Sequence, residues 1–413
     1  MKTTYTPNAS ATSKDIPTAA WSGMLKQLNA STSAHFDVVR AVAAAAVMWG
    51  HLRGLFFVDF GELTHDKLVH KIAYFLTGFG HEAVMVFFVL SGFLISSSIL
   101  RSQASETWSF TEYAINRGTR LYVVLIPGLI FGTLWDRMGS SLFASSSIYS
   151  SALANFGGLV VQHELTIRNF FGNLLFLQTI ACPTYGSNAP LWSIAYEFWY
   201  YVLFPVGLLA IQAWIRKKKS IQALFLAILA LCIGWILGPE KMIGFLIWLG
   251  GFVLVLTSDR PHLRSIFGQK ALLLGTSVIL VMLLIAARTQ KLGPLSSDLV
   301  VGLGFVAFLF AVLRAEFFQV MPTGVYSRSA HLFAGFSYSL YVLHFPFLLF
   351  LRAWLVPVQR WYPDARHLVY GVAIGVATLA FSWFISTFTE LRTGQARKVV
   401  RELFGVGSEK SIT

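Results

Sequence analysis

The chain has 413 residues, of which 55% are hydrophobic and only 12% are charged, and its formal net charge is +13. A soluble protein typically carries about twice that charged fraction, and apolar runs recur from end to end, which excludes a soluble globular protein. The basic residues fall mainly between the apolar runs, where the charge bias of membrane proteins explains them better than nucleic-acid binding does. We therefore expect an all-α polytopic membrane protein whose partners include the lipid bilayer and no nucleic acid.

The N-terminal segment, residues 1–33, is rich in Ser, Thr and Ala and lacks the apolar core of a secretory signal peptide. An amphipathic i, i+3, i+4, i+7 pattern within it predicts a short helix lying on the bilayer surface. The residues that form this pattern are Trp21, Met24, Leu25 and Leu28. We expect a polar tail here.

Ten apolar runs are long enough to cross a bilayer as helices. The predicted spans are 36–58, 80–100, 119–137, 191–214, 221–238, 242–257, 270–288, 296–314, 332–352 and 368–388. An even number places both termini on one side, and most Lys and Arg residues then fall on that same side, including the basic run 216–219. This bias predicts an N-in, C-in orientation in the bacterial cytoplasmic (inner) membrane.

The predicted organisation has a transmembrane domain, 34–390, between the tail 1–33 and a cytoplasmic C-terminal tail, 391–413. The longest connection, about 138–190, faces outward in this scheme. Cys182 and Cys232 lie in a loop and in an apolar run, so we expect neither a disulfide nor a metal framework.

Two ionisable residues of the first span are the leading candidates for function. Arg40 and His51 are eleven residues apart, which is about three helical turns, so both project from one face roughly 16 Å apart. An ionisable group at membrane depth costs several kcal/mol and is usually kept for a purpose. Small residues between them predict a groove beside the helix, and these are Ala43, Ala44 and Val47. The alternative is a helix-packing arginine and a buried, hydrogen-bonded histidine.

The expected depth of residues in the membrane adds two candidates to the group that contains His51. In the N-in orientation, Glu197 of the fourth span and His344 of the ninth lie at a similar level below the outer boundary. A carboxylate that fixes the tautomer of His51 leaves its other nitrogen free to act as a general base. The alternatives are interhelical hydrogen bonds that only hold the bundle together, and a zinc site, which the spacing does not favour. We expect no metal.

A second group lies at the inner face. Arg117 and Arg120 begin the third span level with Arg40, and three guanidinium groups at one depth suit a phosphate. The positive-inside bias alone is the alternative explanation. In the second span, Ser91-Gly92 permits the close approach of another helix or of a thin substrate chain.

Five stretches together resemble motifs of the acyltransferase-3 family of integral membrane acyltransferases. They are RAVAAAAVMWGH (40–51), GHEAVMVFFVLSGF (80–93), NLLFLQ (173–178), LWSIAYE (191–197) and SYSLYVLH (337–344). The last departs from the family pattern at Val342, where Leu is usual. The five occur in the expected order, and ten spans fit the family.

The resemblance implies transfer of an acyl group, usually acetyl, from cytoplasmic acyl-CoA to a hydroxyl of a cell-surface or exported glycan or glycolipid. It also implies a stand-alone member without a fused SGNH hydrolase domain, and leaves any protein partner open. Coenzyme A phosphates would bind at Arg40, Arg117 and Arg120, with His51, oriented by Glu197, as the base. Further substrate-binding candidates from the motifs are Ser91, Gln178, Trp192, Tyr338 and His344.

Two other classes remain open. A proton-coupled transporter of an anionic solute would use the same histidines and carboxylate as a proton relay. A non-catalytic membrane assembly partner would use them only to hold the bundle together. The acceptor hydroxyl, the acyl length, the oligomeric state, and the choice between direct transfer and an acyl-His51 intermediate are left open by the residues.

Overall fold

The computed structural model describes residues 30–64, 67–146, 148–215, 220–257, 269–288, 293–315, 324–356 and 358–406. The helix predicted near Trp21 lies outside these residues. Within them the chain is helical, and only isolated β-bridges occur. The α-helices are α2 (Ala30–Phe56), α3 (Leu68–Leu76), α4 (Gly80–Ala104), α5 (Phe110–Leu142), α6 (Val161–Glu164), α7 (Ile167–Leu174), α8 (Leu191–Ile215), α9 (Ser220–Thr257), α10 (Gln269–Arg288), α11 (Pro294–Arg314), α12 (Val325–Gly335), α13 (Ser337–Leu355), α14 (Ala365–Ser386) and α15 (Thr393–Leu403).

The all-α polytopic class is confirmed. Eight helical runs in the described part of the chain are long and apolar enough to cross a membrane, and α2 is not among them. The predicted spans 221–238 and 242–257 form the two arms of α9, which bends sharply at Gly238 (φ 76°, ψ 174°). Glycine followed by Pro239 explains this bend, because glycine adopts a positive φ without strain and proline lacks the N–H that would continue the helix. The count of ten spans and the N-in, C-in orientation stay predictions.

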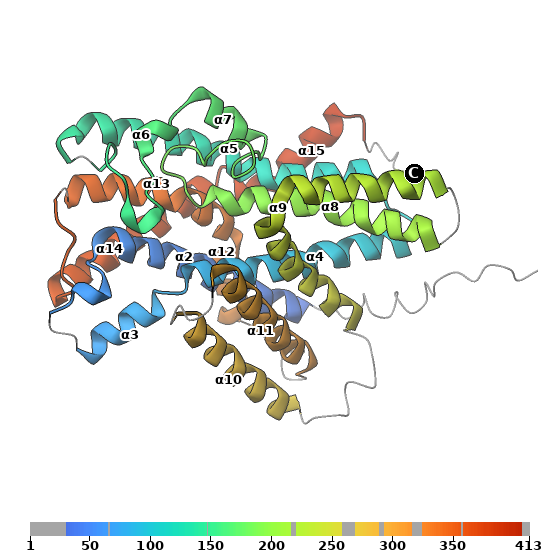
Figure 1. Cartoon of the computed structure of the whole chain (residues 1–413), viewed down its shortest axis with the longest axis horizontal. Helices are drawn as coiled ribbons and strands as arrows, with labels where there is room; N and C mark the ends of the chain where they lie inside the picture. Colours follow the sequence, from blue (N-terminus) through green and yellow to red (C-terminus); the bar gives the residue numbers. More distant parts are fainter. Residues whose placement is uncertain are drawn as a thin grey trace, which may run out of the picture.

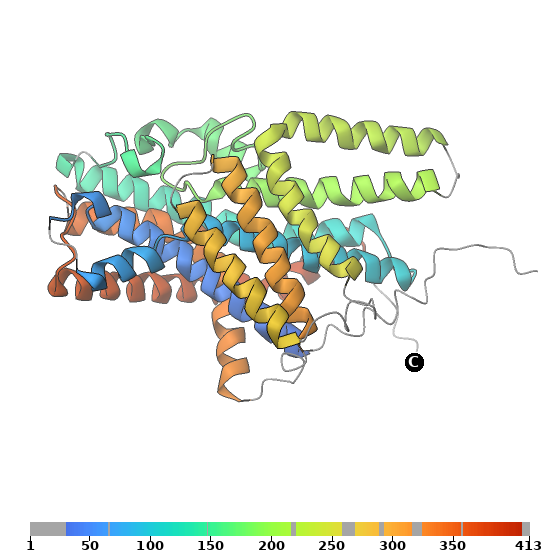
Figure 2. The same ribbon diagram turned by 60° about the horizontal axis from the view of Figure 1, so that its bottom comes forward.

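The helices form a central group flanked by a hairpin and an oblique pair (Figure 1). α2 lies in the middle and contacts α4, α12, α13 and α14, while α5 runs beside α13. α8 and the first arm of α9 form the hairpin, and the second arm turns back toward α10 and α11, which cross the group obliquely (Figure 2). At 33 residues, α5 is about 50 Å long and exceeds the ~30 Å hydrocarbon thickness of a bilayer.

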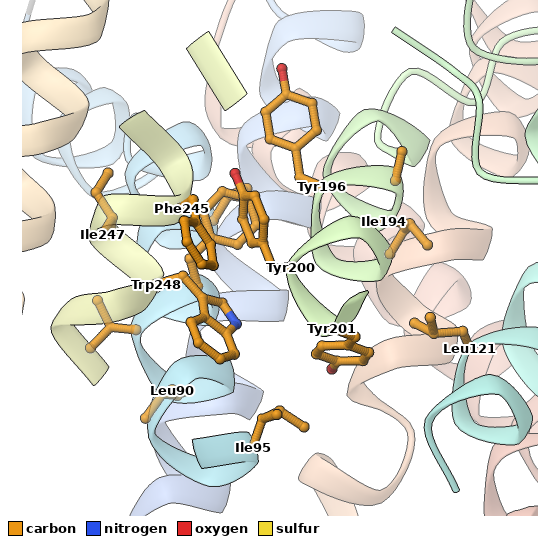
Figure 3. Packing of buried hydrophobic residues seen from close by; sticks show 14 of the residues in the cluster. Leu90, Ile95, Leu121, Ile194, Tyr196, Tyr200, Tyr201, Phe245, Ile247 and Trp248 are labelled. Carbon is orange, nitrogen blue, oxygen red and sulfur yellow. The ribbon is translucent and has the colours of Figure 1, made fainter. Parts of the chain in front are cut away.

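The core joins α4, α8 and α9. Trp248 is fully buried, and its indole lies among Phe245, Tyr200 and Leu90 (Figure 3). α4 and α9 approach closely because a Cβ at Gly92 would collide with the carbonyl of Trp248, and one at Gly251 with the carbonyl of Val89. The Ser91-Gly92 pair therefore serves the close helix packing expected of small residues in membranes.

The connection after α5 folds back into the protein instead of remaining at its surface. Ser187, Asn188 and Leu191 are fully buried. The side chain of Asn188 donates to the carbonyl of Val342 at 2.9 Å, and the backbone N–H of Ser187 donates to Asp136 at 2.7 Å. As a result, α8 begins inside the bundle, level with the middle of α13.

The predicted ninth span is divided at Phe336 into α12 and α13, and α12 turns away from the central group (Figure 2). Glu390, in the 3-10 turn Glu390–Arg392, accepts hydrogen bonds from the backbone N–H groups of Tyr338 and Ser339 at 3.4 and 2.7 Å. A carboxylate at this position satisfies otherwise unpaired N–H groups and complements the positive end of the helix. Residues of the predicted C-terminal tail form α15, which packs on α5.

Candidate functional site

The side chain of His51 pairs with that of His344. His51 Nδ1 and His344 Nε2 are 2.8 Å apart, and the two rings are stacked with centroids at 5.1 Å. The second nitrogen of His344, Nδ1, lies 2.9 Å from the carbonyl oxygen of Leu340. Phe156 and Phe345 meet the ring of His51 edge-on. α2 and α13 thus bring the two histidines together in apolar surroundings.

This arrangement assigns the protons of the pair. A carbonyl oxygen only accepts, so His344 Nδ1 donates to Leu340, and in a neutral imidazole Nε2 is then the acceptor. His51 Nδ1 must therefore be the donor, which leaves the lone pair of a neutral His51 on Nε2. A histidine in this tautomer is able to take a proton from a bound hydroxyl.

The carboxylate of Glu197 lies elsewhere, and its expected pairing with His51 is wrong. Glu197 Oε1 accepts from the hydroxyls of Tyr201 and, at 3.4 Å, Ser91, while Oε2 accepts from Tyr338 at 3.1 Å. The depth predicted for Glu197 is in error because the prediction assumed that α8 starts at the outer membrane boundary. Because α8 starts inside the bundle, Glu197 lies nearer than His51 to the end of the bundle where α2 and α5 begin. This end is called inner, and the opposite end outer, after the predicted orientation.

Glu197 faces an inner cavity that also collects the predicted arginines. The cavity has a volume of about 820 Å³, including the solvent space at its mouth, and draws its walls from α2, α4, α5, α8 and α13. Its polar lining residues include Arg40, Ser91, Arg117, Arg120, Ser193, Glu197, Tyr201, Ser337 and Tyr338, and its apolar walls are mainly from α4. The structure therefore brings together three residues predicted for the donor, two predicted for substrate, and Glu197.

The contacts of the arginines leave part of their hydrogen-bonding capacity free. Arg40 contacts Asp37 at 3.3 Å and Ser337 at 3.4 Å. Arg117 donates to Ser98 at 3.2 Å, and its Nε is buried with no hydrogen-bond partner among the described residues. A neighbouring hollow shares Arg40 and continues along the inner part of α4 past Ser97, Ser98, Arg101 and Ser102. Together the two hollows offer four arginines against two carboxylates.

The groove expected beside Ala43, Ala44 and Val47 is absent, because neighbouring helices fill this face of α2. All three side chains are at most 5% exposed. Gly80 of α4 packs against Val47, and a Cβ there would be in ordinary van der Waals contact with the Val47 Cα at 3.5 Å. A path between the inner face and His51 must instead run between α4, α8 and α13.

His51 lines a separate outer cavity of about 730 Å³, which lies where α4 begins beside α2. Its lining residues are Gly50, His51, Arg53, Gly54, Asp59, Thr77, Gly78, Gly80, His81, Asn155 and Phe156. The inner cavity reaches Val84, one turn below Gly80 on α4. Phe87 and Tyr341 line the inner cavity with their rings in edge contact at 5.9 Å, and the ring of Tyr341 lies 6.2 Å from that of His344.

The other three predicted substrate residues line neither cavity. Gln178 is fully buried and donates to the carbonyl of Leu191 at 2.8 Å, so it holds the start of α8. Trp192 is half-buried and stacks on His81 with ring centroids at 5.9 Å. His344 has both ring nitrogens engaged within the protein.

A metal site is not apparent in the part of the chain that the structure describes, where no group of three or more His, Cys, Asp or Glu side chains is placed to hold an ion. The zinc site considered for His51, Glu197 and His344 needs all three side chains at one point, and the structure separates Glu197 from the histidines.

A family model described as an acyltransferase domain matches residues 34–387. The chain belongs to the acyltransferase-3 family. The resemblance drawn from the five motifs is thereby confirmed, and family membership together with the apolar helices makes it a multi-pass membrane protein.

Curated relatives in this family are distant. An O-acetyl transferase of Shigella phage Sf6 is 25% identical over 204 residues, which is 48% of this chain and 51% of that protein. The peptidoglycan O-acetyltransferase OatA of Listeria monocytogenes is 24% identical over 164 residues, 38% of this chain and 24% of that protein. The acyltransferase MdmB of Streptomyces mycarofaciens is 24% identical over 331 residues, which is 74% of this chain and 76% of that protein. The chain thus spans about half of the phage protein and a quarter of OatA. No solved structure matches the chain.

Sequence reasoning missed several polar residues that line or support these cavities. Tyr201 follows Glu197 by one helical turn, so the i, i+4 spacing was a usable signal. Glu390 lies 46 residues beyond His344, the end of the last motif, and nothing local indicates that it reaches the start of α13. Arg53 and Arg352 line the outer cavities at the ends of their helices, where the sequence shows only ordinary flanking arginines.

Proposed function

We propose that this protein is a membrane O-acyltransferase that moves an acetyl group from cytoplasmic acetyl-CoA to a hydroxyl of a cell-surface or exported glycan or glycolipid. Family membership and the names of the relatives support acyl transfer to oxygen. The observation that carries the proposal for this chain is the free Nε2 of His51 at an outer cavity, directly above an arginine-lined inner one.

The inner cavity suits the acyl donor. Coenzyme A is polyanionic, and guanidinium groups bind phosphate oxygens in pairs. The lining supplies Arg40, Arg117 and Arg120 for the phosphates, with a partnerless Nε on Arg117. Apolar side chains of α4 above the arginines suit the thin arm that carries the thioester. The thioester then reaches His51 past Phe87 and Tyr341, through a displacement of these two rings.

At the reaction centre, His51 Nε2 takes the proton of the acceptor hydroxyl as the oxygen attacks the thioester carbon. The new C–O bond forms, the C–S bond breaks, and the proton passes from His51 to the sulfur, which leaves as the free thiol. His344 acts as a positioning residue, since its acceptor nitrogen fixes the tautomer of His51. Direct transfer requires no acyl-enzyme.

Glu197 takes a different role in this proposal from the orientation of His51. Its carboxylate interacts electrostatically with Arg120 and ties Tyr201, Tyr338 and Ser91 to one point of the donor cavity. Such a network holds the cavity walls in a defined geometry.

The test uses purified protein reconstituted in lipid, radiolabelled acetyl-CoA, and the envelope glycans of the host as acceptor. Thioester consumption and label on glycan are both measured. His51→Ala should still bind coenzyme A but lose about 10²- to 10⁴-fold in transfer. Flux of a solute without thioester consumption would instead establish the proton-coupled transporter.

The donor site has its own test in Arg40→Ala. A charge-assisted hydrogen bond is worth about 1.5–3 kcal/mol, so coenzyme A affinity should fall roughly ten- to a hundred-fold. Lys398→Ala is the matched control, because this cation on α15 is 80% exposed and lines neither cavity. Unchanged affinity in Arg40→Ala would show that the phosphates bind elsewhere.

A further inference from the structure

The outer ends of α2 and α13 enclose a second hollow next to that of His51. It measures about 690 Å³ and is lined by Gly54, Leu55, Ile148, Ala152, Leu153, Asn155, Phe156, Leu349, Arg352, Val358 and Arg360. Gly54, Asn155 and Phe156 line both hollows, so the two adjoin. Phe156 lies at the junction, with its ring 5.7 Å from that of His51.

Three arginines from separate parts of the chain face these two hollows. Arg53 comes from the last turn of α2, Arg352 from the last turn of α13, and Arg360 from the connection to α14. Arg352 is the most enclosed, with only 7% of its surface exposed. Its Nε donates to the carbonyl of Leu55 at 2.8 Å, whereas its Nη1 is buried with no hydrogen-bond partner among the described residues.

The charges of these arginines are not balanced locally. Arg360 is paired with Asp59 at 2.8 Å and Glu62 at 3.1 Å, and its hydrogen bond holds the pKa of Asp59 below the usual value. Arg53 lies over the ring of Tyr74, with its Nε also buried and partnerless. Within the described chain, neither Arg53 nor Arg352 has a carboxylate at salt-bridge distance.

A buried guanidinium with an unused donor is costly unless a bound group completes its hydrogen bonds. The space beside Arg352 and Arg53 has room for such a group, and the unused donors of the two side chains suit an anion. A carboxylate and a phosphate both offer the paired oxygens that guanidinium groups bind best. Arg53 and His51 line the same hollow, and the hollow of Arg352 adjoins it.

We propose that the acceptor substrate carries an anionic group, a carboxylate or a phosphate, and that Arg352 and Arg53 bind it. This anchoring places a neighbouring hydroxyl at Nε2 of His51, with Phe156 packing against the apolar face of the sugar. The inference rests on the proposed function and narrows its acceptor from glycans in general to acidic ones or to sugars on a phosphate-bearing carrier.

Binding of defined probes to the full chain in lipid nanodiscs, without coenzyme A, tests this charge selection. The first pair of probes is a hexuronic-acid oligosaccharide and its carboxyl-reduced, neutral counterpart. The second pair is a neutral sugar on a polyprenyl diphosphate and the same sugar on an uncharged lipid. At least one anionic probe should bind about tenfold or more tightly than its neutral partner. The carboxylate arm and the diphosphate arm distinguish an acidic sugar from a charged carrier.

Substitutions identify the anion site. Arg352→Gln and Arg53→Gln should each weaken the preferred anionic probe about tenfold or more and leave the neutral probe unchanged. Arg53→Gln gives an independent answer should Arg352→Gln fold poorly. Arg366→Gln is the control, because Arg366 is exposed at the outer start of α14 and lines neither hollow.

Equal binding of charged and neutral probes, no binding of either anionic probe, or unchanged binding in both arginine variants would overturn the inference. Thioester consumption is measured separately on the same preparations. Charge-selective binding without any acetyl transfer would contradict the proposed function alone. Transfer to neutral acceptors with no effect of Arg53 or Arg352 would contradict the anionic acceptor alone.

Discussion

His51 depends on a second histidine for its proton arrangement. A carboxylate partner would stabilise the protonated imidazole, whereas His344, itself committed to the carbonyl of Leu340, offers only a neutral acceptor. The pair therefore favours a His51 that is neutral and ready to accept a proton. The neutral pair also avoids burying an uncompensated charge among Phe156 and Phe345.

The role of His344 predicts a specific kinetic defect. His344→Ala removes one orienting hydrogen bond, worth about 1–1.5 kcal/mol, so kcat for acetyl transfer should fall roughly tenfold. The KM for acetyl-CoA should not change, because His344 lies outside the inner cavity. Steady-state kinetics of the reconstituted protein measure both. A raised KM with normal kcat would place His344 in donor binding instead.

Glu197 should behave differently from His344. Glu197→Gln keeps the side-chain shape and removes one negative charge from the arginine-lined cavity. We expect equal or tighter coenzyme A binding and a smaller loss of transfer than in His344→Ala, because Glu197 does not orient His51. Equilibrium binding and transfer rates of the two variants provide the comparison. A larger loss of transfer in Glu197→Gln than in His344→Ala, with coenzyme A still bound, would support the original prediction that Glu197 orients His51.

At the scale of elements, the site depends on the close approach of α4 to α9 and on the start of α8 inside the bundle. α4 supplies much of the inner cavity wall, and its position is set by glycine contacts with the second arm of α9. The segment before α8 inserts between α5 and α13 and so lowers Glu197 toward the arginines. Gly186 permits this insertion, since its φ of +57° favours glycine and a Cβ there would collide with Asp136.

The contact between α4 and α9 predicts a stability effect. Gly251→Ala places a methyl group against the backbone of Val89 and Phe93, and such overpacking should destabilise the protein by about 1–3 kcal/mol. Gly275→Ala is the control: it lies on exposed α10 with nothing within 4 Å, so a gain of up to about 1 kcal/mol is expected. Thermal unfolding in detergent measures both. Equal midpoints of thermal unfolding for the two variants would contradict the tight packing of α4 on α9.

At the scale of the whole molecule, the two cavities lie toward opposite ends of the bundle. The arginine-lined cavity lies near the start of α5 and the histidine cavity near the start of α4. A donor made in the cytoplasm and an acceptor outside it can meet at such a site without either crossing the membrane. This arrangement requires the N-in, C-in orientation.

Cysteine labelling tests that orientation. In a chain with Cys182 and Cys232 replaced by Ser, Glu62→Cys and Lys398→Cys each introduce one thiol at a side chain that is 54% or 80% exposed. A membrane-impermeant maleimide should label Glu62→Cys in intact cells and Lys398→Cys only after permeabilisation. The reverse pattern would place the arginine-lined cavity outside and exclude a cytoplasmic donor at that cavity.

The sequence by itself determined the membrane class, the positions of most helices and the family, because apolar runs and short ordered motifs are local properties. It also singled out Arg40, Arg117, Arg120 and His51. Only the tertiary structure decided which side chains meet. The depth of a residue on α8 depends on where the chain re-enters the bundle, and for this reason Glu197 lies beside the arginines. The partner of His51 is His344 instead. Likewise Arg53, Arg352 and Arg360 come from separate segments, and only folding brings them to two adjoining hollows.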